Sequence, residues 1–323
     1  MTRVLHIDTS MEWRGGQRQL ELLIRGRPGD LWAGVPKSPL AERLGPPYLA
    51  LRPGQHPLNI LALHRLKAHF PLIAAHTSHA GAIALLAGLP TVMHRRVDFV
   101  PTAWKYLRAR HVIAVSAAVK DVLVRVGVPA ERISVVYDGV VPVTAWVDPR
   151  WADLPRPLYG CVGALVAHKG HRYVVEAMAS VPGTLVIAGE GDQRGALTDQ
   201  IRRAGLQDRV VLPGQIPDVA GFYGALDVFV HPSVEEGMGQ AVVEAMSAAC
   251  RVVTTRAGGL AEVVGDAGIL VGAGDAGALA AAMVSALGEP KGRGVSRAAM
   301  FSVAAMVGGT SAVYARFGPS DQI

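Results

Sequence analysis

The chain has 323 residues, of which 50% are hydrophobic and 18% charged, and its formal net charge is +6. This length and apolar content predict about two domains with ordinary cores. The longest apolar region, residues 80–93, is too short and too broken by Gly and Pro to span a bilayer, which excludes an integral membrane protein. Cys161 and Cys250 lie far apart in apolar surroundings, which favours buried free thiols in a reducing compartment over a disulfide.

The positive charge is concentrated in the first half of the chain. Residues 1–150 hold 19 Lys and Arg against 10 Asp and Glu, whereas residues 151–323 hold 13 against 16. A basic half suggests an anionic partner, but the sequence contains no nucleic-acid-binding motif. An anionic phospholipid or a phosphorylated lipid acceptor fits better, and an ordinary basic surface is the alternative.

Apolar runs alternate with amphipathic stretches along the first half. Strands are predicted at residues 3–8, 31–35, 72–76, 91–94, 111–115 and 132–137, and helices at residues 16–26, 59–69, 79–88 and 117–127. The first strand leaves no room for a signal peptide, so a cytoplasmic location is expected.

The second half repeats this alternation. Strands are predicted near residues 158–163, 184–189, 209–212, 227–231, 251–255 and 268–271, and helices near residues 170–180, 195–204, 217–226, 240–249 and 276–287. Such alternation predicts an α/β fold of two Rossmann-like domains with parallel sheets, facing across a cleft. Four prolines between residues 142 and 157 indicate a linker. The expected boundaries are 1–145 for the first domain, 146–157 for the linker and 158–300 for the second domain.

Two glutamates eight positions apart, Glu236 and Glu244, are the most informative residues. Glu236 lies in an irregular loop, Gly237-Met238-Gly239, between a strand and a helix, and Glu244 is expected near the start of that helix. Ligands bind at such strand ends in open α/β sheets. Carboxylates accept hydrogen bonds from the vicinal hydroxyls of sugars and ribose, and a helix N-terminus attracts phosphate. A helix-capping acid beside a solvated glutamate is the simpler alternative.

The residues from Gly189 to Val271 resemble the donor-binding half of the retaining glycosyltransferases of family four, which have the GT-B fold. The matching segments are I-A-G-E-G-D, L-Q-D-R-V-V-L-P-G-Q-I-P-D-V, A-L-D-V-F-V-H-P-S-V-E-E-G-M-G-Q-A-V-V-E-A-M-S-A and G-G-L-A-E-V-V, in that order. The family's paired glutamates fall on Glu236 and Glu244. The resemblance implies that Glu236 contacts the donor sugar and that Glu244 contacts the ribose.

The same resemblance implies a reaction and a domain arrangement. A hexose or similar sugar would move from a nucleotide-diphosphate donor to a glycan or lipid-linked acceptor, without a metal or another cofactor. Assembly of lipopolysaccharide or another envelope polysaccharide is the expected process. The donor would bind the second domain and the acceptor the first. Residues 301–323 would form a closing helix that packs back on the first domain.

Further donor-binding residues lie in glycine-rich turns and beside one lysine. Lys169 follows a strand and would stabilise the diphosphate leaving group. The family's arginine is replaced by Ala164, so one of two expected cations is missing. Paired glycines can let a backbone approach a ligand closely. The remaining donor candidates are Gly15, Gly16, Gly163, Gly189, Glu190 and Gly214.

The first domain supplies candidates for the acceptor side. By resemblance, His94 contacts the donor sugar from that side, and a histidine there could also pass a proton. His76, Ser78 and His79 form a polar group at another strand end, where a zinc site is only weakly supported.

The segment of residues 93–111 interleaves five cations with aromatic residues, which suits the surface of an anionic membrane. Its candidates for acceptor or membrane contact are Arg95, Arg96 and Trp104. A half-buried helix with solvated charges is the alternative.

Three other functions are compatible with parts of the pattern. The first is a sugar-nucleotide epimerase on the same fold. The second is an inactive sugar-nucleotide-binding or scaffold protein, which the loss of a cation at Ala164 keeps open. The third is a nicotinamide-linked dehydrogenase, but Gly189, Gly191 and Gly195 miss the spacing of the dinucleotide fingerprint by one residue.

Overall fold

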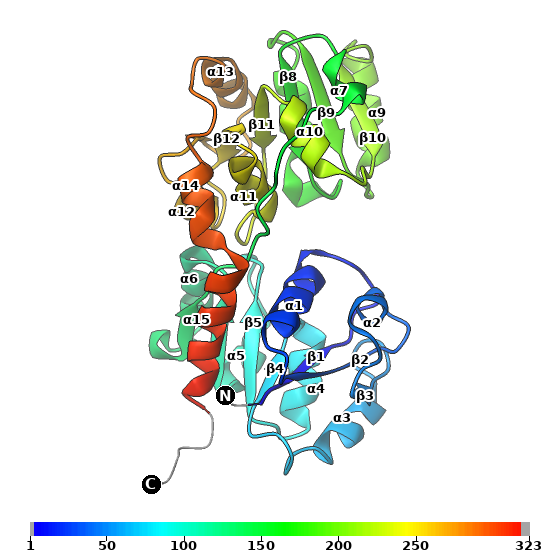
Figure 1. The fold of residues 1–323 in the computed structure, drawn as a ribbon, viewed down its shortest axis with the longest axis vertical. Helices are drawn as coiled ribbons and strands as arrows, with labels where there is room; N and C mark the ends of the chain where they lie inside the picture. The colour runs from blue at the N-terminus through cyan, green and yellow to red at the C-terminus, as the bar shows by residue number, and fades with distance from the viewer. Residues whose placement is uncertain (1–2, 318–323) are drawn as a thin grey trace. The chain divides into compact units, whose positions relative to one another are not determined.

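The computed structural model describes residues 3–317, which form two compact units (Figure 1). Unit 1 contains the described residues up to Gly139 and those from Val303 onward, and unit 2 is Val140–Ser302. Residues 318–323, the last part of the predicted closing helix, lie outside the described residues.

Unit 1 is built on a seven-stranded parallel sheet with the order β3-β2-β1-β4-β5-β6-β7. Its strands are short and mostly buried, as expected for a sheet covered on both faces. Their bounds are β1 (Leu5–Asp8), β2 (Leu31–Gly34), β3 (Leu49–Ala50), β4 (Ile73–Ala75), β5 (Thr91–Arg95), β6 (His111–Ala114) and β7 (Ile133–Val135).

Helices cover both faces of this sheet (Figure 1). They are α1 (Gly15–Gly26), α2 (Pro39–Leu44), α3 (Pro57–His64), α4 (Ser78–Leu86), α5 (Ala103–Arg108), α6 (Ala117–Arg125) and α15 (Val303–Ala315), with a 3-10 turn η1 (Ala130–Arg132). Leu5, Ile7 and Ile73 pack toward α3 and α4, whereas Val4, Leu72 and Ala74 pack with Tyr314 of α15. The alternation of side chains along β1 and β4 therefore divides the core into two layers.

Unit 2 is built on a six-stranded parallel sheet with the order β10-β9-β8-β11-β12-β13. Its strands are β8 (Leu158–Val162), β9 (Thr184–Ala188), β10 (Val210–Gly214), β11 (Val228–His231), β12 (Arg251–Thr255) and β13 (Ile269–Val271). Its helices are α7 (Pro149–Ala152), α8 (His171–Ala177), α9 (Arg194–Arg203), α10 (Val219–Ala225), α11 (Gln240–Ser247), α12 (Leu260–Val264), α13 (Ala276–Ala286) and α14 (Val295–Ala298), with 3-10 turns η2 (Ala167–Lys169) and η3 (Ala299–Phe301). The two sheets confirm the predicted α/β class with parallel sheets.

Short polar side chains start many of the helices directly after a strand or turn. Thr77, Ser116, Asp218 and Asp275 each accept a hydrogen bond from a backbone N–H in the first turn of the following helix. Such caps satisfy donors that the helix itself cannot pair. These caps define the first residue of each helix, and so the point at which the loop after the preceding strand must end.

The region predicted as a linker, residues 146–157, packs within unit 2. The indole N–H of Trp146 donates to Asp218 over 2.9 Å, and a Cβ at Gly224 would lie 2.0 Å from the Trp146 carbonyl oxygen. Trp151 of α7 is 7% exposed. Pro149 is the first residue of α7, directly after the Asp148 cap. This part of the segment is therefore a short helix and not an extended connector.

Among the described residues, no helix combines the length and the apolarity that crossing a bilayer requires. Both cysteines are buried free thiols, as predicted, and burial raises the pKa of Cys250 to about 12.

Candidate functional site

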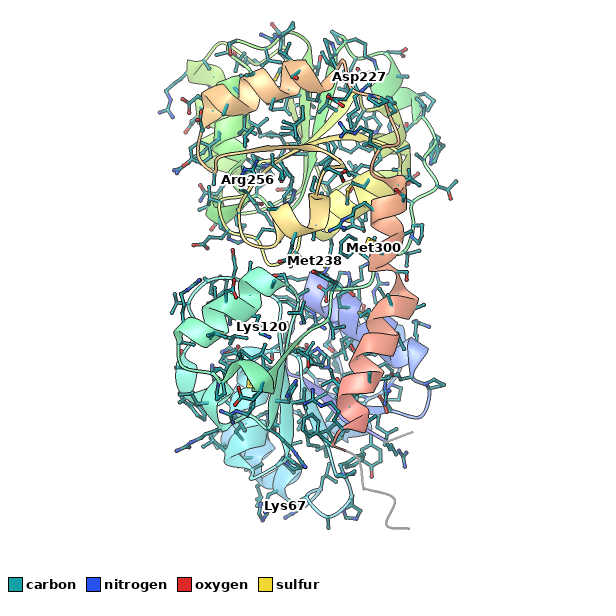
Figure 2. All side chains as sticks on the ribbon, turned by 90° about the vertical axis from the view of Figure 1, so that its left-hand side faces the viewer. Lys67, Lys120, Asp227, Met238, Arg256 and Met300 are labelled. Atoms are coloured by element: carbon teal, nitrogen blue, oxygen red, sulfur yellow. The ribbon has the colours of Figure 1, made fainter. Side chains whose placement is uncertain are left out.

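Unit 2 has a topological switch point between β8 and β11. From β8 the chain proceeds outward to β9 and β10, whereas β11 pairs with the other side of β8 and leads to β12 and β13. At such a point the loops after the two central strands separate and leave room for a ligand. The loops in question are residues 163–170, after β8, and residues 232–239, after β11. In Figure 2, Met238 marks this end of unit 2 and Asp227 marks the opposite end.

The two loops are held against each other by backbone contacts. The Val234 N–H donates to the His168 carbonyl oxygen over 2.8 Å. A Cβ at Gly170 would lie 2.1 Å from the Pro232 carbonyl oxygen, and Gly170 has a φ of +67°. Only glycine accepts both that approach and that backbone angle. The two loops, residues 163–170 and 232–239, are therefore in contact at the switch point, and together they are called the ledge.

The ledge brings together Lys169 and Glu236, two residues that the sequence predicts as functional. The Lys169 ammonium lies 2.5 Å from Glu236 Oε2, with 21% and 13% of the two side chains exposed. The same oxygen lies 2.8 Å from His231 Nε2 and 3.3 Å from the Ser233 hydroxyl. A carboxylate thus stands at the switch point with a cation and two further donors around it.

Glu236 is ionised in this setting. Burial alone would raise the pKa of its carboxyl, but the Lys169 charge and the His231 hydrogen bond together hold that pKa well below its ordinary value. An ionised carboxylate accepts hydrogen bonds and has no proton to donate. The arrangement can therefore orient hydroxyl groups, and it is unsuited to general acid catalysis.

Backbone hydrogen bonds connect the glycines at the carboxyl ends of β8, β9 and β10. The Gly163 N–H donates to the Ala188 carbonyl oxygen over 3.0 Å, and the Gly189 N–H donates to the Gly214 carbonyl oxygen over 2.8 Å. A Cβ at Gly189 would lie 1.9 Å from the Gly163 carbonyl oxygen, so any larger residue would push the turns apart. The three predicted glycines are thereby brought to neighbouring positions, and Glu190 pairs with Arg194 over 2.8 Å at the exposed rim.

The loop after β11 leads into α11, where the second glutamate lies. Gly239 is the residue before α11, and Met238 is 2% exposed. Glu244 is the fifth residue of α11 rather than near its start, it is 6% exposed, and the Tyr223 hydroxyl donates to its Oε2 over 3.2 Å. The two glutamates therefore have different surroundings, because Glu236 lies in the loop after β11 among charged and polar side chains, whereas Glu244 is buried on α11.

In unit 1, the predicted His94 is part of a buried aromatic cluster. It lies within β5, is 7% exposed, and its Nε2 is 2.6 Å from the Tyr314 hydroxyl of α15. Its ring stacks on that of His76 with centroids 4.2 Å apart, and His76 in turn lies 2.9 Å from His6. Burial holds the pKa of His76 and His94 well below the usual range, so both rings are neutral near pH 7. A proton-transfer role for His94 stays a prediction.

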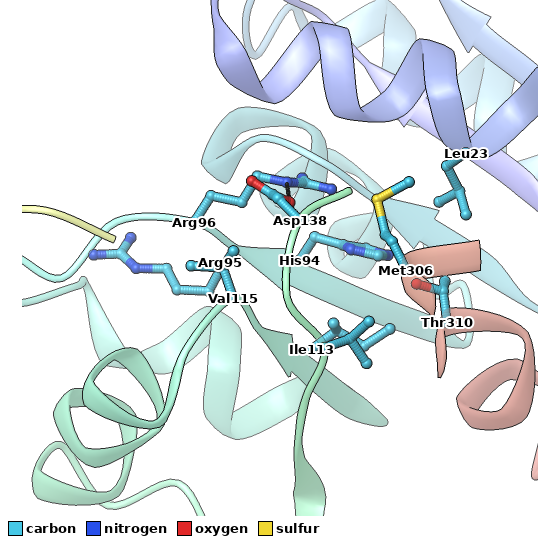
Figure 3. A pocket seen from close by; sticks show the side chains of 10 residues that line it. Leu23, His94, Arg95, Arg96, Ile113, Val115, Asp138, Met306 and Thr310 are labelled. Carbon is cyan, nitrogen blue, oxygen red and sulfur yellow. Dashed lines mark hydrogen bonds and ion pairs between the residues drawn. The ribbon is translucent and has the colours of Figure 1, made fainter. Parts of the chain in front are cut away.

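The other unit 1 candidates are divided between the sheet edge and the surface. Arg96 pairs with Asp138 over 2.9 Å beside a small hollow that His94, Met306 and Thr310 also line (Figure 3). Arg95 also lines this hollow, but its guanidinium points away and donates to the Val97 carbonyl oxygen over 2.9 Å (Figure 3).

The remaining candidates lie on helices. Lys105 donates to the Ser78 hydroxyl, and His79 is exposed on the same first turn of α4. Trp104 lies on α5 beneath the Arg108 guanidinium. Gly15 and Gly16 are the first two residues of α1 rather than a loop.

Sequence reasoning missed His231 and Ser233 as parts of the site. Both flank Pro232 within the quoted motif, and a polar residue on each side of a strand-ending proline was the available signal. Among residues 3–317, no group of three or more His, Cys, Asp or Glu side chains could hold a metal ion.

Comparison with known proteins agrees with this geometry. A sequence profile described as "Glycosyl transferases group 1" matches residues 156–289, and one described as "Glycosyltransferase Family 4" matches residues 17–143. The HepE protein of Anabaena, solved in complex with UDP-glucose, superposes with a TM-score of 0.83 at 22% identity, over 98% of this chain and 100% of that one. Two parallel doubly wound sheets with a ligand-binding switch point define the GT-B class of folds. The chain belongs to the family-four glycosyltransferases.

Curated relatives are about 30% identical to the chain over the segments that align with it. It is 30% identical over 275 residues to a 2-deoxystreptamine N-acetyl-D-glucosaminyltransferase of Streptomyces fradiae, which covers 78% of this chain and 59% of the relative. It is 33% identical over 147 residues to the lipopolysaccharide core biosynthesis mannosyltransferase LpcC of Rhizobium leguminosarum bv. viciae, covering 42% of each. The chain thus spans less than two thirds of the length of these relatives.

Proposed function

We propose that the protein transfers a hexose or similar sugar from a nucleotide-diphosphate sugar to an acceptor hydroxyl, with retention of the anomeric configuration. The observation that carries this proposal is the Lys169–Glu236 pair at the switch point of unit 2, beside the glycine-lined turns. The carboxylate of Glu236 suits the hydroxyl groups of a sugar, and the ammonium group of Lys169 suits the charge of a diphosphate. Both side chains belong to the two loops at the switch point. Glu244 and its surroundings would receive the ribose.

In the proposed reaction, the bond between the anomeric carbon and the diphosphate oxygen breaks. A bond from the acceptor oxygen to the same carbon forms on the same face, and the acceptor's proton passes to the leaving phosphate. Glu236 orients the sugar, and Lys169 stabilises the charge that develops on the diphosphate. Because Ala164 carries no charge where the family's arginine is expected, the contribution of Lys169 is correspondingly large.

The donor and acceptor are proposed from the relatives' names. UDP-glucose is the first donor to assay, since HepE was solved in complex with it. A glycan or lipid-linked acceptor of lipopolysaccharide or another envelope polysaccharide is our leading acceptor, bound by unit 1. A 2-deoxystreptamine acceptor is the second candidate, because the relative with 78% coverage is named for it.

We also propose that α5 and the segment before it dock on an anionic membrane surface. Phe99, Val100 and Leu107 are 51%, 76% and 40% exposed, and Arg108 and Arg110 are exposed beside them. Apolar side chains beside cations favour the interface of an anionic bilayer. In a flotation experiment, the protein should be recovered with vesicles only when the vesicles contain anionic lipid. Equal recovery with neutral vesicles would contradict docking on an anionic membrane.

Sugar transfer is tested with donors labelled in the sugar and a panel of both acceptor classes. The wild-type protein should form a glycoside with the same anomeric configuration as the donor sugar. Glu236→Gln should lower kcat/KM about 10- to 100-fold, because the hydrogen bonds of the sugar to a charged carboxylate are lost. Conversion of the donor to an epimer, or binding without any transfer, would favour an epimerase or an inactive binding protein instead. A nicotinamide dinucleotide should not bind.

A further inference from the structure

Three donors converge on a single oxygen of Glu236. Lys169 reaches Oε2 from the loop after β8 with a long side chain, whereas His231 and Ser233 reach it from the end of β11, immediately before it in the chain. His231 is 4% exposed and Ser233 is fully buried. The carboxylate is thus held by one flexible cation and by two short, enclosed donors.

The His231–Ser233 segment is anchored to the next strand. The Thr254 hydroxyl donates to the His231 carbonyl oxygen over 2.8 Å, and the Thr255 hydroxyl donates to the Ser233 carbonyl oxygen over 2.5 Å. The His231 ring also stacks on Phe229, with centroids 6.2 Å apart and 24° between the planes. The ring therefore has a fixed place from which to present its nitrogen.

The hydrogen bonds define the protonation of the ring. Nε2 must carry the proton to donate to the carboxylate, and the Ser233 hydroxyl then donates to the same carboxylate. The groups that face the ring are Glu236, Ser233, Lys169 and His171 of α8. Burial lowers the pKa of His231 and so favours the neutral ring near pH 7, in which Nε2–H can serve as this donor.

We infer that His231, assisted by Ser233, is the positioning residue that fixes the Glu236 carboxylate for the sugar moiety of the donor. The inference rests on the proposed function, because it assigns a role within the same site. Lys169 is placed to turn toward the diphosphate when the donor binds, and His231 then keeps Glu236 in place. The binding of the nucleotide moiety does not depend on His231, so a change at His231 should affect binding of the sugar moiety and leave nucleotide binding unchanged.

The test compares His231→Phe, which keeps the volume and removes the donor, with His231→Gln, whose amide can replace Nε2–H. Calorimetric titration with UDP-glucose and with UDP, together with transfer kinetics, is the readout. His231→Phe should lower kcat/KM and the affinity for the sugar nucleotide about 10- to 100-fold and change the affinity for UDP less than about twofold. His231→Gln should recover most of the loss, and Ser233→Ala should show a smaller loss.

Two results would overturn the inference. One is a His231→Phe protein that binds the sugar nucleotide as wild type does; the other is an equal loss for UDP and the sugar nucleotide, which indicates a general structural role. Proton NMR of the ring tests the contact without any donor: the Nε2–H signal should persist in wild type and exchange fast in Glu236→Ala. A persistent signal in Glu236→Ala would also contradict it. Absence of any nucleotide-sugar binding by wild type, with the NMR result intact, would reject the proposed function alone.

Discussion

At the scale of single residues, the two glutamates of the motif differ in how the fold treats their charge. Glu236 is held ionised by the Lys169 charge and the His231 hydrogen bond at the switch point, whereas Glu244 is buried on α11 and accepts a hydrogen bond from the Tyr223 hydroxyl. We propose that Glu236 meets hydroxyl groups of the donor sugar and that Glu244 accepts a hydroxyl group of the ribose. Two carboxylates eight residues apart in the sequence therefore have different environments in the fold.

Removing the Lys169 charge should make activity sensitive to acid. Without Lys169, burial would raise the pKa of Glu236 from its depressed value, and the carboxylate would be lost as pH falls through the new, higher pKa. In Lys169→Met, kcat/KM measured from pH 9 to pH 5 should decline toward low pH more steeply than in wild type, in addition to a uniform loss from weaker diphosphate stabilisation. Lys120→Met in unit 1 is the control, and parallel pH profiles for wild type and Lys169→Met would contradict the assignment.

At the scale of elements, a cluster of aromatic and titratable side chains ties α15 to the sheet of unit 1. Tyr314 of α15 bonds His94 of β5, and His94 stacks on His76, which contacts His6 of β1. His6 also lies 3.0 Å from Asp30. Strands β1 and β5, the residue that follows β4, and α15 thus share one polar network.

Tyr314→Phe should destabilise unit 1 by about 1 kcal/mol, because it removes the hydrogen bond to His94 and leaves that buried nitrogen unpaired. Urea unfolding followed by fluorescence measures the change. Tyr48→Phe, at a position that is 54% exposed, is the matched control and should have almost no effect. Equal stability of Tyr314→Phe and wild type would show that α15 is held by its apolar contacts alone.

Acidification should weaken unit 1 through the same cluster. His6, His76 and His94 have a pKa below the usual value when folded, because burial disfavours their charged forms. In the unfolded chain they take up protons below about pH 6.5, so stability is complete above that pH and is lost as pH falls. The melting temperature of His76→Leu should therefore fall less than that of wild type between pH 7.5 and about 5. A steeper fall in the variant would contradict this sign.

The sequence predicts the strands of both sheets except β3, because apolar runs of strand length alternate with amphipathic helices, whereas β3 has only the two residues Leu49 and Ala50. It also predicts Lys169 and Glu236, which the structure brings together. It does not predict α7, because the prolines that suggest a linker also open a helix behind Asp148. The sequence also does not predict the hydrogen bond between His94 and Tyr314, because 220 residues separate the two and local patterns carry no information on such a contact.

At the scale of the whole molecule, the chain passes between the two units twice. It leaves unit 1 after Gly139, completes unit 2, and returns at Val303 so that α15 packs on α1 and the first sheet. Each unit has its own sheet and its own core. The donor contacts of the proposed function, at Lys169, Glu236, Glu244 and the turns of Gly163 and Gly189, belong to unit 2, whereas the sequence candidates Gly15, Gly16 and His94 lie in unit 1. We therefore expect donor binding to affect unit 2 more than unit 1.

Donor binding should consequently protect one unit more than the other. At 100 times its dissociation constant, a nucleotide-diphosphate sugar stabilises the state that binds it by about 2.7 kcal/mol. Hydrogen exchange followed by mass spectrometry should show slower exchange in the loops after β8, β9 and β11, whereas β1 to β4 should be unchanged. Protection confined to unit 1 would contradict the assignment of the donor to unit 2.

The most direct test is a crystal structure with a non-transferable nucleotide-diphosphate sugar. We predict that the sugar hydroxyls lie within hydrogen-bonding distance of the Glu236 carboxylate, that the diphosphate lies against the turns at Gly163 and Gly189, and that Glu244 receives the ribose. A ligand bound at the opposite edge of the unit 2 sheet, or a Glu236 side chain turned away from the sugar, would contradict the account.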